Sequence, residues 1–227
     1  VSTSEGDVME HQSRKPQLTS LVINEGDDTK LEDDDFKVLS AGFRCNQTLT
    51  NLALLNAYLA HHSYPLESLI GHPTLETLRL SMSSISDDAL LSLVKVLHHP
   101  SCRIQSLYLD DMLETEDSES PRVDFFANAL ANGISSSLIS LSLEKNRVSC
   151  DEFQNLMMAI YRSCPNLEEL DLTDNCVKRI IWNHSDAVPS VLCANEPLSS
   201  LAGGVNDSSG MSSTISSHKP CALQRLF

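Results

Sequence analysis

The segment from Leu167 to Val177 reads LEELDLTDNCV and decides the fold. Apolar residues occupy its positions 1, 4, 6 and 11, and an asparagine occupies position 9. Positions 4 and 6 give the alternation that is typical of a short strand with one buried face. The asparagine side chain can bond to backbone groups where the chain turns out of such a strand. The segment therefore predicts a strand that ends in a tight turn.

Five earlier segments repeat this pattern. Leucine or isoleucine fills positions 1, 4 and 6 in all six segments, and successive first positions lie 26 to 34 residues apart. Self-similarity at a near-constant period indicates a repeat array. We call each period a unit and number its positions from the first apolar residue. The six units begin at Leu18, Leu49, Leu75, Ile104, Leu138 and Leu167.

Helical periodicity follows the strand patterns. Ala89, Leu93 and Leu97 lie four residues apart, on one face of a helix. Ser149 and Glu152 form a capping-box sequence before another helix. Each unit is therefore predicted to be strand, turn, helix and turn, in an α/β fold with a parallel sheet and an outer layer of helices. Further expected core residues on the helix faces are Phe36, Leu39, Phe43, Phe126, Leu130, Phe153, Leu156 and Ile160.

This strand pattern, followed by a helix, resembles the leucine-rich repeat of the long, ribonuclease-inhibitor-like class, whose units have about 28 to 29 residues. Residues 138–146 and 167–177 carry the resemblance best. The resemblance implies a solenoid with a curved parallel sheet on the concave face and helices on the convex face. Position 9 departs from the pattern in four units, so less regular turns are expected at Gly26, Ala57, Ser83 and Met112.

Three regions are predicted along the chain. Residues 1–17 are polar and aperiodic, and we interpret them as a flexible tail or linker. Residues 18–182 are predicted to form the solenoid of six recognisable repeats. Residues 183–227 are expected to be degenerate or partly disordered repeats, truncated in the middle of a repeat. Because the first residue is Val1, the chain is expected to be a fragment.

Weaker patterns give four further expectations. Leu198–Gly203 is predicted as a degenerate seventh strand, and Leu223 with Leu226 as the start of an eighth unit. Ile181 is expected to continue the face of a helix. The acidic stretch Glu114–Glu119 is interpreted as a solvated insertion between a strand and a helix.

Charge and cysteine content limit the class of partner and the compartment. The chain has 16 Lys and Arg against 31 Asp and Glu, a formal net charge of −15. This sign argues against nucleic-acid and anionic-membrane binding, and suits either a basic protein partner or simple solubility. Seven cysteines without a C-x-x-C pair favour reduced, buried thiols in an intracellular, cytoplasmic protein. Three sequons, at Asn46, Asn183 and Asn206, weakly favour secretion instead.

The sequence contains no recognisable catalytic motif. G-x-S-x-G, a Gly-rich phosphate loop and H-E-x-x-H are all absent from it. His98, His99 and Cys102 could approach one another, but histidines are also favoured by the negative end of a helix. Cys45, Cys102 and Cys164 precede strands and are expected in tight apolar corners. We therefore predict no enzyme, no cofactor and no metal site.

Positions 2, 3, 5, 7 and 8 are expected to face away from the helices and to line the concave surface, the usual binding face of such arrays. Those of units 4 to 6 are rich in acid. Neighbouring strands lie about 4.8 Å apart, so their carboxylates would raise a joint negative potential. A tyrosine among them could anchor an arginine or lysine of a partner. The alternative is an ordinary hydrophilic sheet face. The candidate protein-binding residues are Arg79, Tyr108, Asp110, Asp111, Glu144, Glu168, Glu169, Asp171 and Asp174.

The sequence predicts a non-catalytic module that binds another protein, expected to be basic, through its concave face. Two alternatives stay open. The long-repeat class also includes the Ran GTPase-activating protein, which implies a GTPase-activating or other regulatory role, although the resemblance assigns no catalytic residue here. The chain could instead be the substrate-recognition part of a larger receptor or ubiquitin-ligase adaptor. The oligomeric state is not predicted.

Overall fold

The computed structural model describes residues 17–26, 30–59, 62–113 and 122–176, and the backbone of three later strands at 179–181, 190–192 and 225–226. Three expectations lie outside these residues, namely the tail before residue 17, the acidic stretch 114–119 and the seventh strand at 198–203. No helix in the described ranges is both long and apolar enough to cross a membrane.

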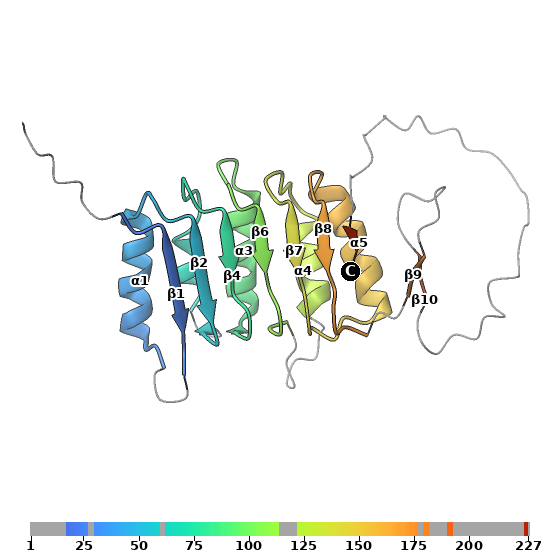
Figure 1. Ribbon diagram of the computed structural model, residues 1–227, viewed down its shortest axis with the longest axis horizontal. Coiled ribbons are helices and arrows are strands. Elements are labelled where there is room, and N and C mark those ends of the chain that lie inside the picture. The colour runs from blue at the N-terminus through green and yellow to red at the C-terminus, as the bar shows by residue number, and fades with distance from the viewer. Residues whose placement is uncertain are drawn as a thin grey trace, which may run out of the picture.

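A seven-stranded parallel sheet forms the centre of the molecule (Figure 1). Its strands are neighbours in the order β1-β2-β4-β6-β7-β8-β11. Position 4 of each predicted unit lies in one register row, so the sequence period sets the strand pairing. The strands are β1 (Ser20–Asn24), β2 (Asn51–Leu55), β4 (Thr77–Arg79), β6 (Ser106–Tyr108), β7 (Ser140–Ser142), β8 (Glu169–Asp171) and β11 (Arg225–Leu226).

Helices cover one face of this sheet. Consecutive helices contact each other along the chain, and Figure 1 shows α1, α3, α4 and α5 behind the strands. We call the other face, which no described helix covers, the open face. The α/β class with a parallel sheet is thereby confirmed. The helices are α1 (Asp33–Cys45), α2 (Tyr64–Glu67), α3 (Asp87–His98), α4 (Arg122–Leu130) and α5 (Cys150–Ser163).

Local capping explains where the longer helices begin. The predicted box at Ser149 and Glu152 precedes α5 and satisfies two backbone N–H groups. Glu32 and Asp35 make an equivalent box before α1. The sequence pattern of a serine followed by a glutamate three residues later did not predict this second box. Helix α2 is only 4 residues long, because its unit spans just 26 residues. The helical segment of that unit is therefore shorter than the pattern predicts.

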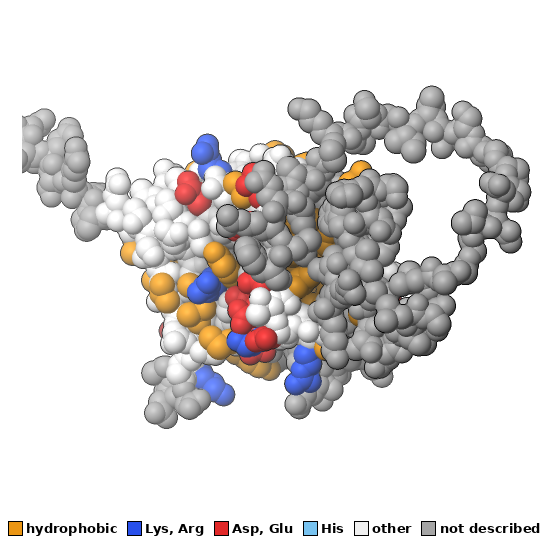
Figure 2. Space-filling view, turned by 45° about the vertical axis from the view of Figure 1, so that its right-hand side comes forward, with side chains coloured by type: hydrophobic (Ala, Val, Ile, Leu, Met, Phe, Trp, Pro, Cys, Tyr) orange, Lys and Arg blue, Asp and Glu red, His pale blue; other side chains and the backbone are white. Residues whose placement is uncertain are grey.

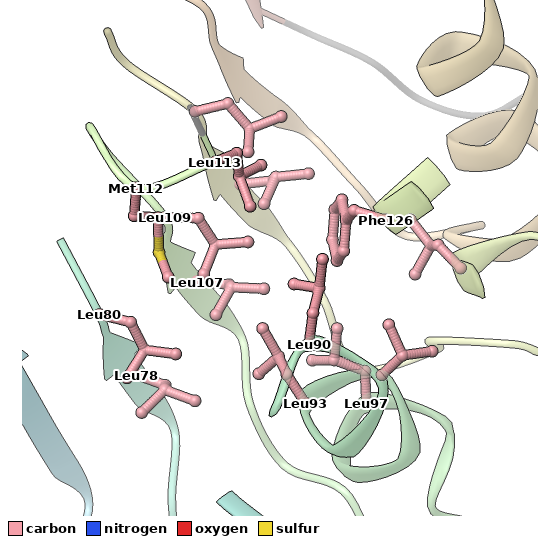
Figure 3. Close-up of a cluster of buried hydrophobic side chains, with 14 of the residues drawn as sticks. Leu78, Leu80, Leu90, Leu93, Leu97, Leu107, Leu109, Met112, Leu113 and Phe126 are labelled. Carbon is pink, nitrogen blue, oxygen red and sulfur yellow. The ribbon is translucent and has the colours of Figure 1, made fainter. Parts of the chain in front are cut away.

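The leucine rows and the helix faces form one core. Position-4 residues Leu52, Leu78, Leu107, Leu141 and Leu170 are all buried. Figure 3 shows side chains of the β4 and β6 segments pointing toward those of α3 and α4. Each buried leucine contributes about 2–5 kcal/mol, judged by truncation to alanine. All the helix-face residues predicted for this core are buried except Leu39, which is partly exposed.

The first unit differs from the others. Leu18 is 50% exposed, and Leu21 and Ile23 are only partly buried against the core. The reason is that β1 forms an end of the sheet, with β2 as its neighbour on one side. The predicted buried face of this strand is therefore only partly buried in the first unit.

Two expectations beyond the sixth unit are corrected. Ile181 lies in a strand, β9 (Arg179–Ile181), which pairs antiparallel with β10 (Ser190–Leu192), rather than in a helix. Two adjacent isoleucines favour a strand, because β-branched side chains fit a pleated backbone better than a helix. Strand β11 is in the expected register, with Leu226 opposite Leu170, but it lies directly beside β8. It therefore takes the place of a seventh strand and not of an eighth.

The cysteines only partly follow the prediction. Cys164 is buried and Cys102 is half-buried, but Cys45 is exposed, so the apolar corner does not extend to the first unit. Those three and Cys176 are free thiols. Cys150 is disulfide-bonded, so the expectation of reduced thiols is wrong at this residue.

Candidate functional site

The turn after each strand has the same backbone conformation in five successive units. Position 8 has a positive φ of 52° to 58° at Asn56, Met82, Asp111, Lys145 and Asp174. Such a conformation is uncommon for residues other than glycine. The turns of units 2, 3 and 4 are therefore as regular as the later ones, against expectation. Only the first unit departs, because Glu25 at its position 8 lacks a positive φ.

Hydrogen bonds to the following unit hold these turns. The backbone N–H of Met82 donates to the carbonyl of Asp110 at 2.8 Å, and that of Asp111 donates to the carbonyl of Glu144 at 2.8 Å. The N–H of Lys145 donates to the carbonyl of Thr173 at 3.0 Å. The five position-8 side chains with a positive φ are exposed, whereas Glu25 of the first unit is buried. The turns thus present one side chain per unit at a fixed spacing along the rim of the open face.

Position 9 joins one unit to the preceding one. The Asn146 Oδ1 accepts from the N–H groups of Met112 and Leu113 at 3.0 and 2.8 Å, and its Nδ2 donates to the carbonyl of Leu109 at 2.8 Å. Asn175 does the same for Val148 N–H, at 2.8 Å. The prediction that these amides satisfy backbone groups at the turn is confirmed.

Three of the predicted acidic site residues are used within the protein. Asp110 accepts from the Ser81 hydroxyl at 3.1 Å, from the Ser142 hydroxyl and from the Glu144 N–H at 3.2 Å. Asp171 accepts from the N–H and hydroxyl of Thr173 at 2.9 and 2.6 Å. Those carboxylates position strands and turns, which limits their availability to a partner.

The third of these acids, Glu144, is paired with Lys145. The Lys145 ammonium donates to the Glu144 carboxylate, which is the main reason why the pKa of Lys145 is raised. The nearby charges of Asp174 and Asp111 raise this pKa further. The positive charge of Lys145 therefore lies within the acidic part of the open face. The negative potential there is weaker than the number of acidic residues in the sequence suggests.

Arg79 and Tyr108 are neighbours across β4 and β6. The Arg79 guanidinium carbon lies 4.3 Å from the centre of the Tyr108 ring, a cation–π contact. The two residues are opposite each other in the strand register. This ring face, which was expected to receive a cation from a partner, already holds one from the same chain.

Four predicted acids stay available. Asp111, Glu168, Glu169 and Asp174 are exposed. Among the residues that the structure describes, no side chain makes a hydrogen bond or an ion pair with any of the four carboxylates. Figure 2 shows acidic side chains gathered in the middle of the described surface, with basic and apolar side chains beside them.

Two of the hollows lined by described residues include predicted site residues. One, of about 510 Å³, lies where the strands begin and includes Glu76, Arg103 and Glu168. The other, of about 280 Å³, lies where the strands end. Its lining combines predicted acids with apolar residues that were not predicted as site residues. The second hollow is lined by Leu55, Arg79, Ser81, Met82, Asp110, Asp111, Glu144 and Lys145.

Sequence reasoning missed this apolar component. Val22 and Met82 are 64% and 51% exposed on the sheet and its turns. The signal was present, because valine and methionine stand at positions 5 and 8, where the other units are mostly polar or charged. The predicted site was chosen mainly by charge, so it did not include these two apolar residues.

The histidines near α3 have structural roles. The His98 ring bonds to the carbonyl of Leu130 at 3.1 Å, and the His99 ring bonds to the Ser101 hydroxyl at 2.8 Å. Within the described ranges, no group of three or more His, Cys, Asp or Glu side chains is arranged to hold a metal ion. Compared with protein-family models and with curated proteins, the chain gives no match.

Proposed function

We propose that the chain is a leucine-rich-repeat solenoid of the ribonuclease-inhibitor-like class, which binds another protein through the open face of its sheet. In this proposal the face is concave, the action is binding rather than catalysis, and the partner presents a basic surface. The observation that carries the proposal is the set of exposed carboxylates that make no hydrogen bond or ion pair with a described side chain, at Asp111, Glu168, Glu169 and Asp174.

Charge and geometry support a protein partner over other ligands. Position-8 side chains of adjacent units are about 4.8 Å apart, so Asp111 and Asp174, which are two units apart, lie about 10 Å from each other, about one Debye length at 0.1 M salt. Their joint potential attracts cations and repels phosphates. The net charge of −15 acts in the same direction at long range. A folded basic surface can reach several of these carboxylates at once.

The test neutralises the available acids. Asp111→Asn with Asp174→Asn removes two charges, and asparagine tolerates the positive φ at both positions. The immobilised chain is incubated with cell extract at rising salt, and the captured proteins are identified. We expect basic proteins that elute at moderate salt from the parent chain and bind weakly to the double variant.

A matched control changes the same charge elsewhere. Asp88→Asn with Asp151→Asn removes two exposed acids from α3 and α5, on the helix side of the sheet. Capture of the same proteins should persist in this control. Equal loss in both double variants, or no loss in either, contradicts a site on the open face.

An intracellular location is part of the proposal. Four described cysteines are free thiols, and the Asn46 sequon amide already accepts from Thr48 and Leu49 N–H, at 2.7 Å each. The disulfide at Cys150 points the other way, because disulfides persist mainly in oxidising compartments. Alkylation of thiols at the moment of lysis distinguishes an intracellular location from an oxidising compartment. We expect Cys45, Cys102, Cys164 and Cys176 to be alkylated once the protein is denatured. A block at any of these four thiols contradicts the location.

A further inference from the structure

The open face has an apolar part next to its acidic part. Val22 of β1 lies opposite Ala53 of β2 in the strand register, and Leu55 is two residues further along β2 on the same face. Leu55 and Met82 line the same hollow as Asp111. Apolar side chains thus gather over β1, β2 and the end of β4, while the available acids follow β6 and β8.

Met82 is the least expected of these side chains. It has a φ of 57° and a backbone N–H bonded to Asp110, which keep it on the rim of the face. A left-handed conformation costs free energy for a residue with a long side chain. Because the Met82 side chain is exposed to water, no burial of apolar surface offsets this cost. A methionine side chain is flexible and packs well against irregular apolar surfaces. Contact with an apolar group of a partner would therefore bury the Met82 side chain.

The charges next to Met82 favour a cation. Asp111 is the position-8 neighbour of Met82 in the next unit, and Lys145 follows with Asp174 beyond it. Lys145 forms its ion pair with Glu144, whereas no described side chain makes a hydrogen bond or an ion pair with Asp111 or Asp174. A second copy of this chain would bring further negative charge to the face and is disfavoured.

We infer that the open face binds an amphipathic basic segment of another protein. Its apolar side chains lie over Val22, Leu55 and Met82, and its lysines or arginines lie at Asp111 and Asp174. The inference rests on the proposed function and specifies the partner for it. Met82 and Asp174 are three strand intervals apart, about 14 Å, which about four extended residues span.

The experiment selects peptides from a random dodecapeptide library displayed on phage against the intact chain. We expect enriched peptides that combine Leu, Met or Phe with Lys or Arg, separated by about four residues. The best peptide is synthesised with a fluorescent label, and its affinity is measured by anisotropy at several salt concentrations. Failure to enrich any peptide, or enrichment of peptides without an apolar group, overturns the inference.

Two sets of variants test the two halves of the surface separately. Val22→Thr with Met82→Asn removes apolar contacts but keeps a β-branched residue in the strand and a φ-tolerant residue in the turn. We expect affinity to fall about tenfold with the salt dependence unchanged. Asp111→Asn with Asp174→Asn should weaken binding and also flatten the salt dependence. Val38→Thr, on the exposed side of α1, is the apolar control and should change nothing.

These outcomes separate this inference from the function on which it rests. If the acidic variants weaken binding and the apolar variants do not, the amphipathic segment is wrong and a basic partner stands. If neither set changes the affinity of the selected peptide, the open face is not its site, and both proposals fail.

Discussion

Single residues at positions 8 and 9 connect neighbouring units. Asn146 is buried and makes three bonds to backbone groups of the preceding unit. Ser83 performs a smaller version of this role, accepting from Ala57 N–H at 3.2 Å and donating to the carbonyl of Leu54 at 3.0 Å. Ala57 and Met112 lack such a group, yet the turns that contain them keep their conformation. The following unit therefore supports each turn.

Asn146→Ala is expected to lower the free energy of unfolding by about 2–4 kcal/mol, because it leaves buried N–H and carbonyl groups without partners. Ser83→Ala removes fewer bonds and should cost about 1–2 kcal/mol. Urea denaturation followed by circular dichroism measures both. Equal losses in the two variants would show that the number of bonds at position 9 does not determine stability.

Substitutions at Met82 test the strain at position 8. Met82→Asn should leave stability unchanged or raise it slightly, because asparagine adopts a positive φ with little cost. Met82→Val should cost about 1–2 kcal/mol, since a β-branched residue is disfavoured there. Thermal unfolding of both variants gives the comparison. A more stable valine variant would refute the assigned turn geometry.

At the scale of elements, helix length and capping differ between units. Helix α5 has 14 residues and a full capping box, whereas α2 has 4 residues and no side-chain cap bond. The rest of unit 2 is held by turns and by the short parallel pair β3 (Tyr58–Leu59) and β5 (Ser84–Ile85). The helix side therefore varies from unit to unit while the strand side repeats.

Ser149→Ala is expected to destabilise the protein by about 1 kcal/mol, because the Glu152 N–H loses its acceptor at the start of α5. Gln154→Ala, on the exposed side of the same helix, is the control and should not lower stability, since alanine favours helices. Chemical denaturation distinguishes the two. A neutral Ser149→Ala would mean that α5 is held by its packing alone.

At the scale of the whole molecule, two histidines among the described residues lie between units, with His72 buried and His98 half-buried. Burial is the main cause that lowers the pKa of both His72 and His98 from the ordinary value of 6.5. The unfolded chain therefore binds more protons than the native state below that pH. Stability from these groups is fully present above about pH 6.5 and is lost as the pH falls.

We expect the urea midpoint to be lower at about pH 5.5 than at about pH 7.5, where neutral imidazole dominates in both states. His72→Gln with His98→Gln should reduce this difference, whatever its effect on overall stability. The two midpoints are measured for each protein at constant ionic strength. An unchanged pH dependence in the double variant would assign the effect to other groups.

Much of the fold was predictable because its signals are local. The row Leu52, Leu78 and Leu107 follows from the period-2 alternation within each strand and from the period between units. The capping box can be recognised from the four adjacent residues 149–152 alone. The place of β11 was not predictable in this way, since it depends on which distant strand the chain meets, whereas β9 pairs with the nearby β10.

The candidate site was predictable as a face but not residue by residue. The sequence by itself determined which positions lie on the sheet and that the later ones are acidic, because side-chain alternation is a property of the backbone. Only the tertiary structure decided which acids are available. Asp110 and Asp111 are adjacent in sequence, yet Asp110 is bonded to Ser81 and Ser142 from units on either side. Those partners are 29 and 32 residues away, and only the stacking of units brings their hydroxyls to the carboxylate.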